Sequence, residues 1–355
     1  MSEPTVFVFA NADLEGRSNR RMEEAGCRLT FGDEAWHVPG CVYEDDMAAR
    51  AAEAVAMTGT SIRSAPVNRR IIEGALRLRI IAKCTVGTDD IDVDAATDLG
   101  VLVTHAPTQA NWGGVAEGAM AMILTMLKRN REKDAHVKAG GWKHESLIGT
   151  YLGRRDEDGY AGLSVGIVGF GRIGGRMVEL LKPWHVRLLV CDPFVDDAKF
   201  AEYGVERVDL DTLLADSDIV SLHPTLNPTS RRMMGAAQFR AMKQSALFVN
   251  TSRGGTMDEV ALADAIAAGE IAGAALDVFL DEPMDRNSKL LDMGNEVLLS
   301  PHMISHNHGG GLGPGIQWAA NAVLAALRGE VPDNVFNPDV LPRWRERFAG
   351  NALIA

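Results

Sequence analysis

The sequence predicts an α/β protein whose strands lie parallel in the sheet. Short apolar runs alternate with longer helical patterns almost throughout the 355 residues, and this alternation is typical of strands joined by crossover helices. The short runs are apolar at successive positions, as expected of strands that are buried on both faces. A chain of this length can form two domains, each with its own hydrophobic core.

Two series of elements follow one another along the chain. The first is expected to have strands at residues 5–10, 56–57 with their neighbours, 78–82 and 101–104, and helices at 44–54, 67–73 and 116–129. The second is expected to have strands at 165–168, 187–190, 219–222, 246–249 and 274–276, and helices at 173–181 and 316–327. The tail, residues 331–355, contains several prolines and is expected to pack against the first series.

The boundary between the two domains has two candidate positions. A polar, glycine-rich stretch at residues 148–162 offers a single cut. If the last helix instead returns to the N-terminal domain, the chain crosses between the domains twice, near residues 107 and 303. We favour this second arrangement, in which residues 1–106 and 304–355 form a substrate-binding domain and residues 107–303 form a nucleotide-binding domain.

The net charge and the cysteines restrict the class of function. With 48 acidic and 36 basic residues, the formal net charge is −12, which argues against nucleic acid or an anionic membrane as the main partner. Cys27, Cys41, Cys84 and Cys191 are scattered, with no C-x-x-C pair. We therefore expect free thiols, no zinc site and a cytoplasmic location. The N-terminus also lacks the basic region and apolar core of a signal peptide.

A glycine loop of the G-x-G-x-x-G type begins at residue 169, between an apolar run and a helical pattern. In that context the glycines allow a tight turn, a close approach of the backbone to a pyrophosphate and close packing of the helix. Amides at the start of the helix then point at the phosphates, where the helix dipole favours an anion. The residues expected to contact the nucleotide are Gly169, Gly171, Arg172, Ile173 and Gly174.

Asp192 follows the next predicted strand, 18 residues after Gly174. A carboxylate at this position accepts hydrogen bonds from the ribose hydroxyls and repels a 2′-phosphate. The cofactor predicted by this loop and this carboxylate is therefore NAD, in a Rossmann-type, doubly wound domain.

Three further side chains carry chemistry downstream of the loop. Arg253 comes directly after an apolar run, where a guanidinium can hold a carboxylate and polarise a neighbouring carbonyl. Hydride transfer to a ketone creates an alkoxide that needs a proton, and His302 is suited to supply it near neutral pH. Glu282 would fix the tautomer of that imidazole. Together they predict the interconversion of a 2-hydroxy acid and a 2-oxo acid.

These residues give the chain a resemblance to the D-isomer-specific 2-hydroxyacid dehydrogenases, which include glycerate, phosphoglycerate and D-lactate dehydrogenases. The matching segments are residues 85–92, 115–117, the glycine loop, 249–254, 277–283 and 301–302. The resemblance runs from about residue 71 to 332. It implies a D-stereospecific enzyme with a smaller flavodoxin-like substrate domain made from both chain ends. It also implies a homodimer formed through the helix that starts near Val115.

The resemblance also implies individual roles. Arg253 would bind the substrate carboxylate and carbonyl, His302 would be the acid/base, and Glu282 its partner. The backbone amides of Val86 and Gly87 would clamp the substrate carboxylate. Asp277 would contact the nicotinamide carboxamide, and Thr251 and Arg253 would line the cofactor.

Three departures from the family pattern leave the substrate open. The loop at residues 108–114 is apparently one residue longer and contains Trp112, which could contact the substrate or fill a cavity. His223-Pro224-Thr225 replaces the usual His-x-Pro, and residues 303–309 replace a segment of small residues after His302. A dehydrogenase for a bulky or aromatic 2-oxo acid is therefore one alternative. A corepressor-like protein that senses NAD(H) is another. His306 and His308 could suggest a metal, but no further ligand completes such a site, and none is expected.

Overall fold

The computed structural model describes residues 3–32, 43–60, 66–308 and 312–355, so Cys41 lies outside the described residues. The chain forms two compact units: unit 1 comprises Met1–Asn111 and His306–Ala355, and unit 2 comprises Trp112–Ser305. The chain thus passes from unit 1 to unit 2 and back. No helix within the described ranges is long and apolar enough to cross a lipid bilayer.

Unit 1 is built on a five-stranded parallel sheet. In sheet order its strands are β2 (Arg28–Phe31), β1 (Thr5–Ala10), β3 (Ala56–Gly59), β4 (Ile80–Lys83) and β5 (Leu102–Thr104). Its helices are α1 (Arg17–Glu24), α2 (Glu44–Ala51), α3 (Arg69–Gly74), α4 (Val93–Asp98), α12 (Gly313–Leu327), η5 (Pro338–Val340) and α13 (Leu341–Phe348). The strand order 2-1-3-4-5 is that of flavodoxin-like folds.

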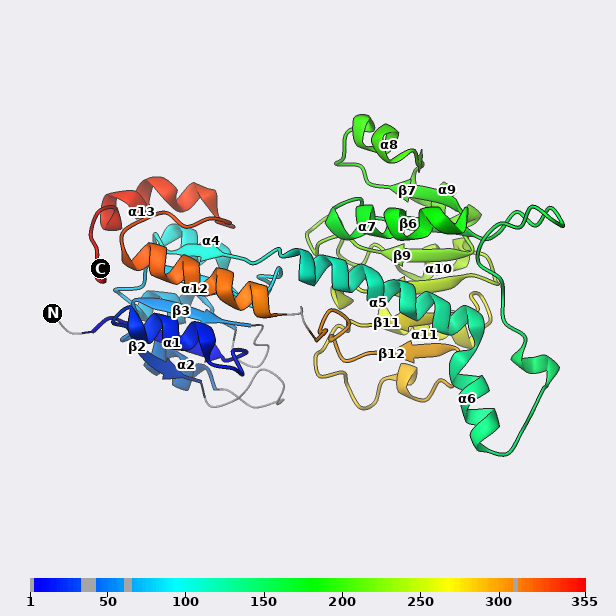
Figure 1. The fold of residues 1–355 in the computed structure, drawn as a ribbon, viewed down its shortest axis with the longest axis horizontal. Helices are drawn as coiled ribbons and strands as arrows, with labels where there is room; N and C mark the ends of the chain where they lie inside the picture. The colour runs from blue at the N-terminus through cyan, green and yellow to red at the C-terminus, as the bar shows by residue number, and fades with distance from the viewer. Residues whose placement is uncertain (1–2, 33–42, 61–65, 309–311) are drawn as a thin grey trace. The chain divides into compact units, whose positions relative to one another are not determined.

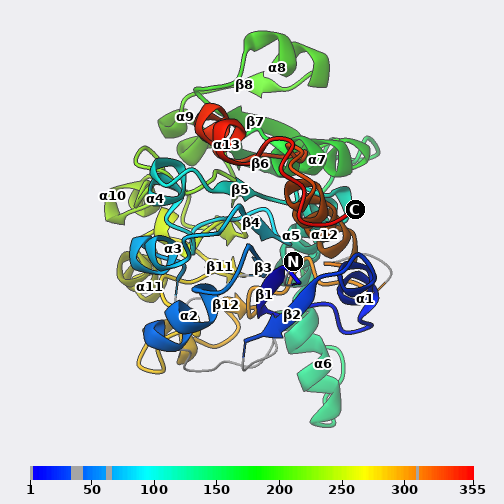
Figure 2. The ribbon, with the colours of Figure 1, turned by 90° about the vertical axis from the view of Figure 1, so that its left-hand side faces the viewer.

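Successive residues of a strand face opposite sides of its sheet, and in unit 1 each side has its own core. Val6 packs in the core shared with α1 and α12, whereas Phe7 and Phe9 pack in the core shared with α2, α3 and α4. Figure 2 shows these helices on the two faces of the sheet. Trp344 of α13 is fully buried in the α12 core and donates from Nε1 to the carbonyl of Arg79 at 2.9 Å. The expectation that the tail packs on the first series is therefore confirmed.

Unit 2 is built on a seven-stranded parallel sheet (Figure 1). In sheet order its strands are β12 (Val297–Leu299), β11 (Gly273–Leu276), β10 (Leu247–Asn250), β9 (Ile219–Leu222), β6 (Ser164–Val168), β7 (Arg187–Cys191) and β8 (Glu206–Arg207). Numbered along unit 2, this order contains the 3-2-1-4-5-6 arrangement of the Rossmann fold with one added strand. The predicted fold class, parallel α/β with a Rossmann unit and a flavodoxin-like unit, is confirmed.

The helices of unit 2 include those that cover both faces of its sheet. They are α5 (Gln109–Lys128), α6 (Asn130–Lys138), η1 (Glu145–Leu147), α7 (Arg172–Leu181), η2 (Lys182–Trp184), α8 (Asp197–Tyr203), α9 (Leu210–Asp216), α10 (Ala236–Ala241), η3 (Gly254–Thr256), α11 (Glu259–Ala267) and η4 (Lys289–Leu291). Helix α6 has no buried residue. The core on one face includes side chains of α5, α7 and α8, and the core on the other includes side chains of α9, α10 and α11. The carboxyl ends of the strands remain for the loops that carry the candidate site.

Candidate active site

The glycine loop lies at the point where the strand order of unit 2 reverses, because β6 is flanked by β7 and β9. Ligands of open parallel sheets bind at such a point. Gly169 adopts φ +90°, and a Cβ there would lie 2.7 Å from the nitrogen of Pro224. A Cβ on Gly174 would lie 2.1 Å from the carbonyl oxygen of Gly169. Only glycine therefore lets this turn lead directly into α7, whose first two residues are Arg172 and Ile173.

Asp192 closes the loop from the neighbouring strand. Its Oδ2 accepts a hydrogen bond from the amide of Phe170 at 2.7 Å, and its Oδ1 accepts one from the amide of Phe194 at 2.9 Å. The carboxylate thus fixes the backbone just before Gly171, a role that the spacing in the sequence did not reveal. Each carboxylate oxygen keeps further capacity to accept a hydrogen bond, so a ribose contact is compatible with this geometry.

Two buried polar atoms in unit 2 fit a bound nucleotide. His223 and Thr251 follow β9 and β10, and neither His223 Nδ1 nor Thr251 Oγ1 has a hydrogen-bond partner among the described residues. Buried polar atoms are usually paired, so these two are available to a polar ligand at the carboxyl edge of the sheet. His223 Nε2 lies 2.9 Å from Ser221 Oγ, and burial lowers the pKa of this imidazole to about 3. The residues present therefore fit NAD.

The loop after β10 places Arg253. Its carbonyl accepts hydrogen bonds from Asn250 Nδ2 at 3.2 Å and from Thr256 Oγ1 at 2.6 Å, and its Nη1 donates to the carbonyl of Ser252 at 2.7 Å. A Cβ on the next residue, Gly254, would lie 1.9 Å from the carbonyl carbon of Phe279. The backbone that follows Arg253 is therefore packed against the loop that leads to Glu282.

Glu282 and His302 are brought together although they are 20 residues apart. His302 Nδ1 lies 2.8 Å from Glu282 Oε2, and Glu282 Oε1 accepts a hydrogen bond from the amide of Phe279 at 3.1 Å. The glutamate is half-buried and the imidazole is more exposed. Since one ring nitrogen faces the carboxylate, the other, Nε2, is left for a reacting group. A proton held at Nδ1 by the carboxylate would also fix the tautomer of the ring.

Asp277, predicted as a nicotinamide contact, holds the chain that follows His302. Its Oδ1 accepts from the amide of Met303 at 3.0 Å and its Oδ2 from the amide of Ile304 at 3.3 Å. Burial raises the pKa of the Asp277 carboxyl above its ordinary value, although hydrogen bonds from Ser300 and from these amides act in the opposite direction. His302 itself has φ +56°, and Asp277 holds the two residues that follow it.

In unit 1, Val86 and Gly87 lie in the loop after β4. Their amides donate to no acceptor among the described residues, while His105 Nδ1 lies 3.2 Å from the carbonyl of Val86. Beneath this loop Lys83 Nζ contacts both carboxylate oxygens of Asp90, at 2.8 and 2.6 Å, and donates to the carbonyl of Thr60 at 2.5 Å. The Lys83 and Asp90 side chains are 0% and 3% exposed. No pattern in the sequence indicated this buried ion pair.

The remaining predicted residues are placed as follows. Trp112 is half-buried in the first turn of α5, so the segment 108–114, expected as a loop, is helical from Gln109. His306 is half-buried and His308 is exposed. Among the described residues, no group of three or more His, Cys, Asp or Glu side chains is arranged to hold a metal ion.

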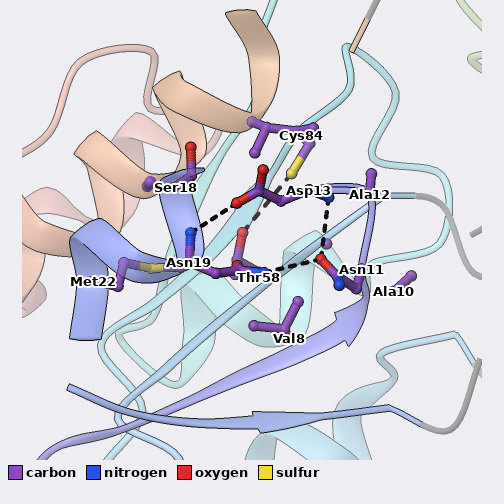
Figure 3. A pocket seen from close by; sticks show the side chains of 13 residues that line it. Val8, Ala10, Asn11, Ala12, Asp13, Ser18, Asn19, Met22, Thr58 and Cys84 are labelled. Carbon is purple, nitrogen blue, oxygen red and sulfur yellow. Dashed lines mark hydrogen bonds between the residues drawn. The ribbon is translucent and has the colours of Figure 1, made fainter. Parts of the chain in front are cut away.

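A cavity in unit 1 lies at the ends of β1 and β3 (Figure 3). Its volume of about 20 Å³ is enough for one water molecule but not for a 2-oxo acid. The polar side chains around it accept hydrogen bonds from nearby backbone amides: Asp13 Oδ2 accepts from the backbone amide of Asn19 at 2.8 Å, and Asn11 Oδ1 from that of Asp13 at 3.1 Å. Burial raises the pKa of the Cys84 thiol in its wall to about 11. We therefore assign this cavity a structural role.

Comparisons with known proteins agree with this geometry. The family model for the NAD-binding domain of D-isomer specific 2-hydroxyacid dehydrogenases matches residues 120–303. A glyoxylate reductase from Thermococcus litoralis is 34% identical over 346 residues, which are 96% of this chain and 98% of that protein. A D-3-phosphoglycerate dehydrogenase from Archaeoglobus fulgidus is 35% identical over 276 residues, or 78% of this chain, and the match spans only 50% of that relative.

Solved structures give the same result. The crystal structure of D-lactate dehydrogenase from Aquifex aeolicus, in complex with NAD and lactic acid, matches with a TM-score of 0.79 and 26% identity, over 92% of this chain and 96% of that one. The family, the NAD dependence and the enzyme class expected from the sequence are confirmed. This chain belongs to the D-isomer-specific 2-hydroxyacid dehydrogenases and is an NAD-dependent oxidoreductase.

Proposed function

We propose that the protein interconverts a small 2-oxo acid and its D-2-hydroxy acid, with His302 as the acid/base. The observation that carries the proposal is the 2.8 Å contact between His302 Nδ1 and Glu282 Oε2, which leaves Nε2 for the substrate oxygen. Glyoxylate is the first substrate to test, because a glyoxylate reductase is 34% identical to this chain over 98% of its own length.

The cofactor and the substrate have separate proposed binding residues, except that Arg253 is proposed to contact both. When bound, NADH supplies the hydride that reduces the substrate carbonyl. The residues proposed to bind it are Gly169, Gly171, Arg172, Ile173, Gly174, Asp192, Thr251, Arg253 and Asp277. For the substrate we propose that the amides of Val86 and Gly87 and the guanidinium of Arg253 hold the carboxylate, and that Trp112 contacts the side chain.

In the reductive direction His302 would donate the proton from Nε2 to the substrate oxygen as negative charge grows there. Glu282 keeps the ring in place and stabilises the cationic form that exists before the transfer. Arg253 adds a second positive group beside the carbonyl, and a preorganised positive site is a large contributor to catalysis of this type. In the oxidative direction the same imidazole would accept the hydroxyl proton.

The test is NADH oxidation with glyoxylate, hydroxypyruvate, pyruvate, phenylpyruvate and phosphohydroxypyruvate. We expect His302→Asn to lower kcat by at least about 10²-fold while NADH still binds. His185→Asn is a matched control, because His185 is also a histidine at positive φ (+53°) in unit 2 but is exposed and lies outside the site. Turnover with phenylpyruvate alone would indicate the bulky-substrate alternative. NADH binding without turnover of any acid would favour the NAD(H)-sensing alternative, and near-normal kcat in His302→Asn would remove His302 from the mechanism.

We also propose that the protein is a cytoplasmic homodimer. Figure 1 shows α6 and the segment after it extending from the body of unit 2. This region exposes two large apolar side chains, Trp142 (74%) and Ile148 (75%), which a second copy of the chain would cover in the proposed dimer. Light scattering of the purified protein would test the proposed dimer by its molar mass. The described cysteines Cys27, Cys84 and Cys191 are free, which supports a reducing compartment.

A further inference from the structure

The segment after His302 departs from the small residues of the family pattern, and the structure shows where its large side chain goes. Ile304 packs against the core that α5 shares with the seven-stranded sheet. It fits against Gly118 of α5: a Cβ on Gly118 would lie 2.0 Å from Ile304 Cγ1 and 3.0 Å from the Ile304 carbonyl oxygen. The absence of a side chain at residue 118 is therefore what makes room for the isoleucine.

Asp277 also holds the segment that contains Ile304. Its carboxylate accepts the amides of Met303 and Ile304, the two residues that follow His302. The backbone of Ile304 thus lies between a buried carboxylate and a helix. A shift of that backbone would be passed along the chain to Met303 and to His302, which has a positive φ that non-glycine residues rarely adopt.

We propose that Gly118 and Ile304 form a fitted pair that positions His302 for proton transfer. This inference rests on the proposed function, since it assigns the pair to the acid/base. Neither residue is expected to touch the substrate, so both are positioning residues. Their effect arises because a displacement of about 1 Å at a reacting group can cost roughly 10²-fold in rate.

The test is a double-mutant cycle on the steady-state reduction of the best 2-oxo acid. Gly118→Ala forces Ile304 to move, and we expect kcat to fall by about 10-fold or more, with the KM and the Kd of NADH within about 2-fold. Ile304→Ala leaves the segment loose and should lower kcat by a smaller factor. Gly118→Ala combined with Ile304→Ala removes the atom that clashes, so kcat should recover at least partly from the Gly118→Ala value.

Gly113→Ala is the matched control. It makes the same substitution in the same helix, but a Cβ at residue 113 meets no atom within 4 Å. We expect normal kcat and an unchanged or higher melting temperature, because alanine favours a helix more than glycine does.

The outcomes separate the two proposals. If the wild-type enzyme turns over a 2-oxo acid, two results would overturn the fitted pair and leave the proposed function standing. One is a normal kcat in Gly118→Ala, and the other is no recovery of kcat in the folded double variant. No wild-type turnover with any acid would overturn both. If Gly118→Ala does not fold, the decrease in kcat for Ile304→Ala and its recovery in the double variant decide the question.

Discussion

Two loops carry the proposed chemistry, and different kinds of interaction stabilise them. The loop after β12 presents a partly exposed imidazole. It is held by the packing of Ile304 against Gly118 and by the amides of Met303 and Ile304, which donate to the Asp277 carboxylate. The loop after β4 presents backbone amides and is held from below by the fully buried Lys83–Asp90 pair. The first loop is thus anchored by backbone amides and by the apolar packing of Ile304, whereas the second is anchored by a buried ion pair between side chains.

The largest expected effect comes from breaking the buried pair. Lys83→Met removes the buried ammonium group that contacts the Asp90 carboxylate and the carbonyl of Thr60, so we expect the free energy of unfolding to fall by about 3–5 kcal/mol. Lys83→Met combined with Asp90→Leu should restore most of this loss, because an apolar pair needs no desolvation of charge. Urea unfolding measures both variants.

Lys289→Met is the control for that experiment. It breaks the Lys289–Asp264 pair, which has a similar 2.7 Å contact but lies on the surface with side chains 66% and 59% exposed. We expect little change in the urea midpoint, since exposed pairs contribute little. Equal losses for Lys83→Met and Lys289→Met would show that burial of the first pair has no special importance.

A smaller effect is expected from Asp277→Asn in the other loop. The amide group of asparagine offers one acceptor oxygen in place of two, so one of the amides of Met303 and Ile304 loses its partner. The stability lost should be about 1–3 kcal/mol, and hydrogen exchange of these amides should become faster. Unchanged exchange would mean that the carboxylate does not anchor the loop, whatever happens to NADH binding.

The smallest effect concerns pH and the imidazole of His223. Its folded pKa of about 3 lies below the ordinary value of 6.5, so the unfolded chain takes up a proton as the pH falls below 6.5 while the folded protein does not. Stability is therefore lost as the pH falls from 6.5 toward 3. Between pH 7 and 5 we expect a loss of about 1–2 kcal/mol from this group. His223→Gln should lack this component in urea unfolding at the two pH values, and an equal pH dependence in both proteins would exclude His223 as its source.

The sequence predicted the elements that are buried on both faces, because continuous apolar runs identify them. The strand expected at residues 5–10 and the one expected at 219–222 have these bounds in the structure. The strands β2, β8 and β12 were not predicted; all three are short, lie at sheet edges and are not fully buried. Helix α5 begins at Gln109 rather than at 116, since two glycines near its start suggested a loop.

For the candidate site, residue types could be predicted but not their supports. The sequence indicated that Arg253, Glu282 and His302 lie in loops that follow strands. Their catalytic roles stay predictions. Contacts such as Gly254 with Phe279 or Lys83 with Asp90 depend on how separate loops pack. No local pattern encodes such a contact, so only the three-dimensional structure reveals it.

The double crossing of the chain has a consequence for synthesis on the ribosome. Residues 1–111 are made before unit 2 and can build the sheet of unit 1 with α2, α3 and α4 on one face, but α12, which covers the other face together with α1, is made after unit 2. Domains generally fold as units during synthesis. Unit 2 can therefore complete its fold while the part of the unit 1 sheet that α12 covers is still exposed. The core of unit 1 is completed only after residues 313–348 have been made.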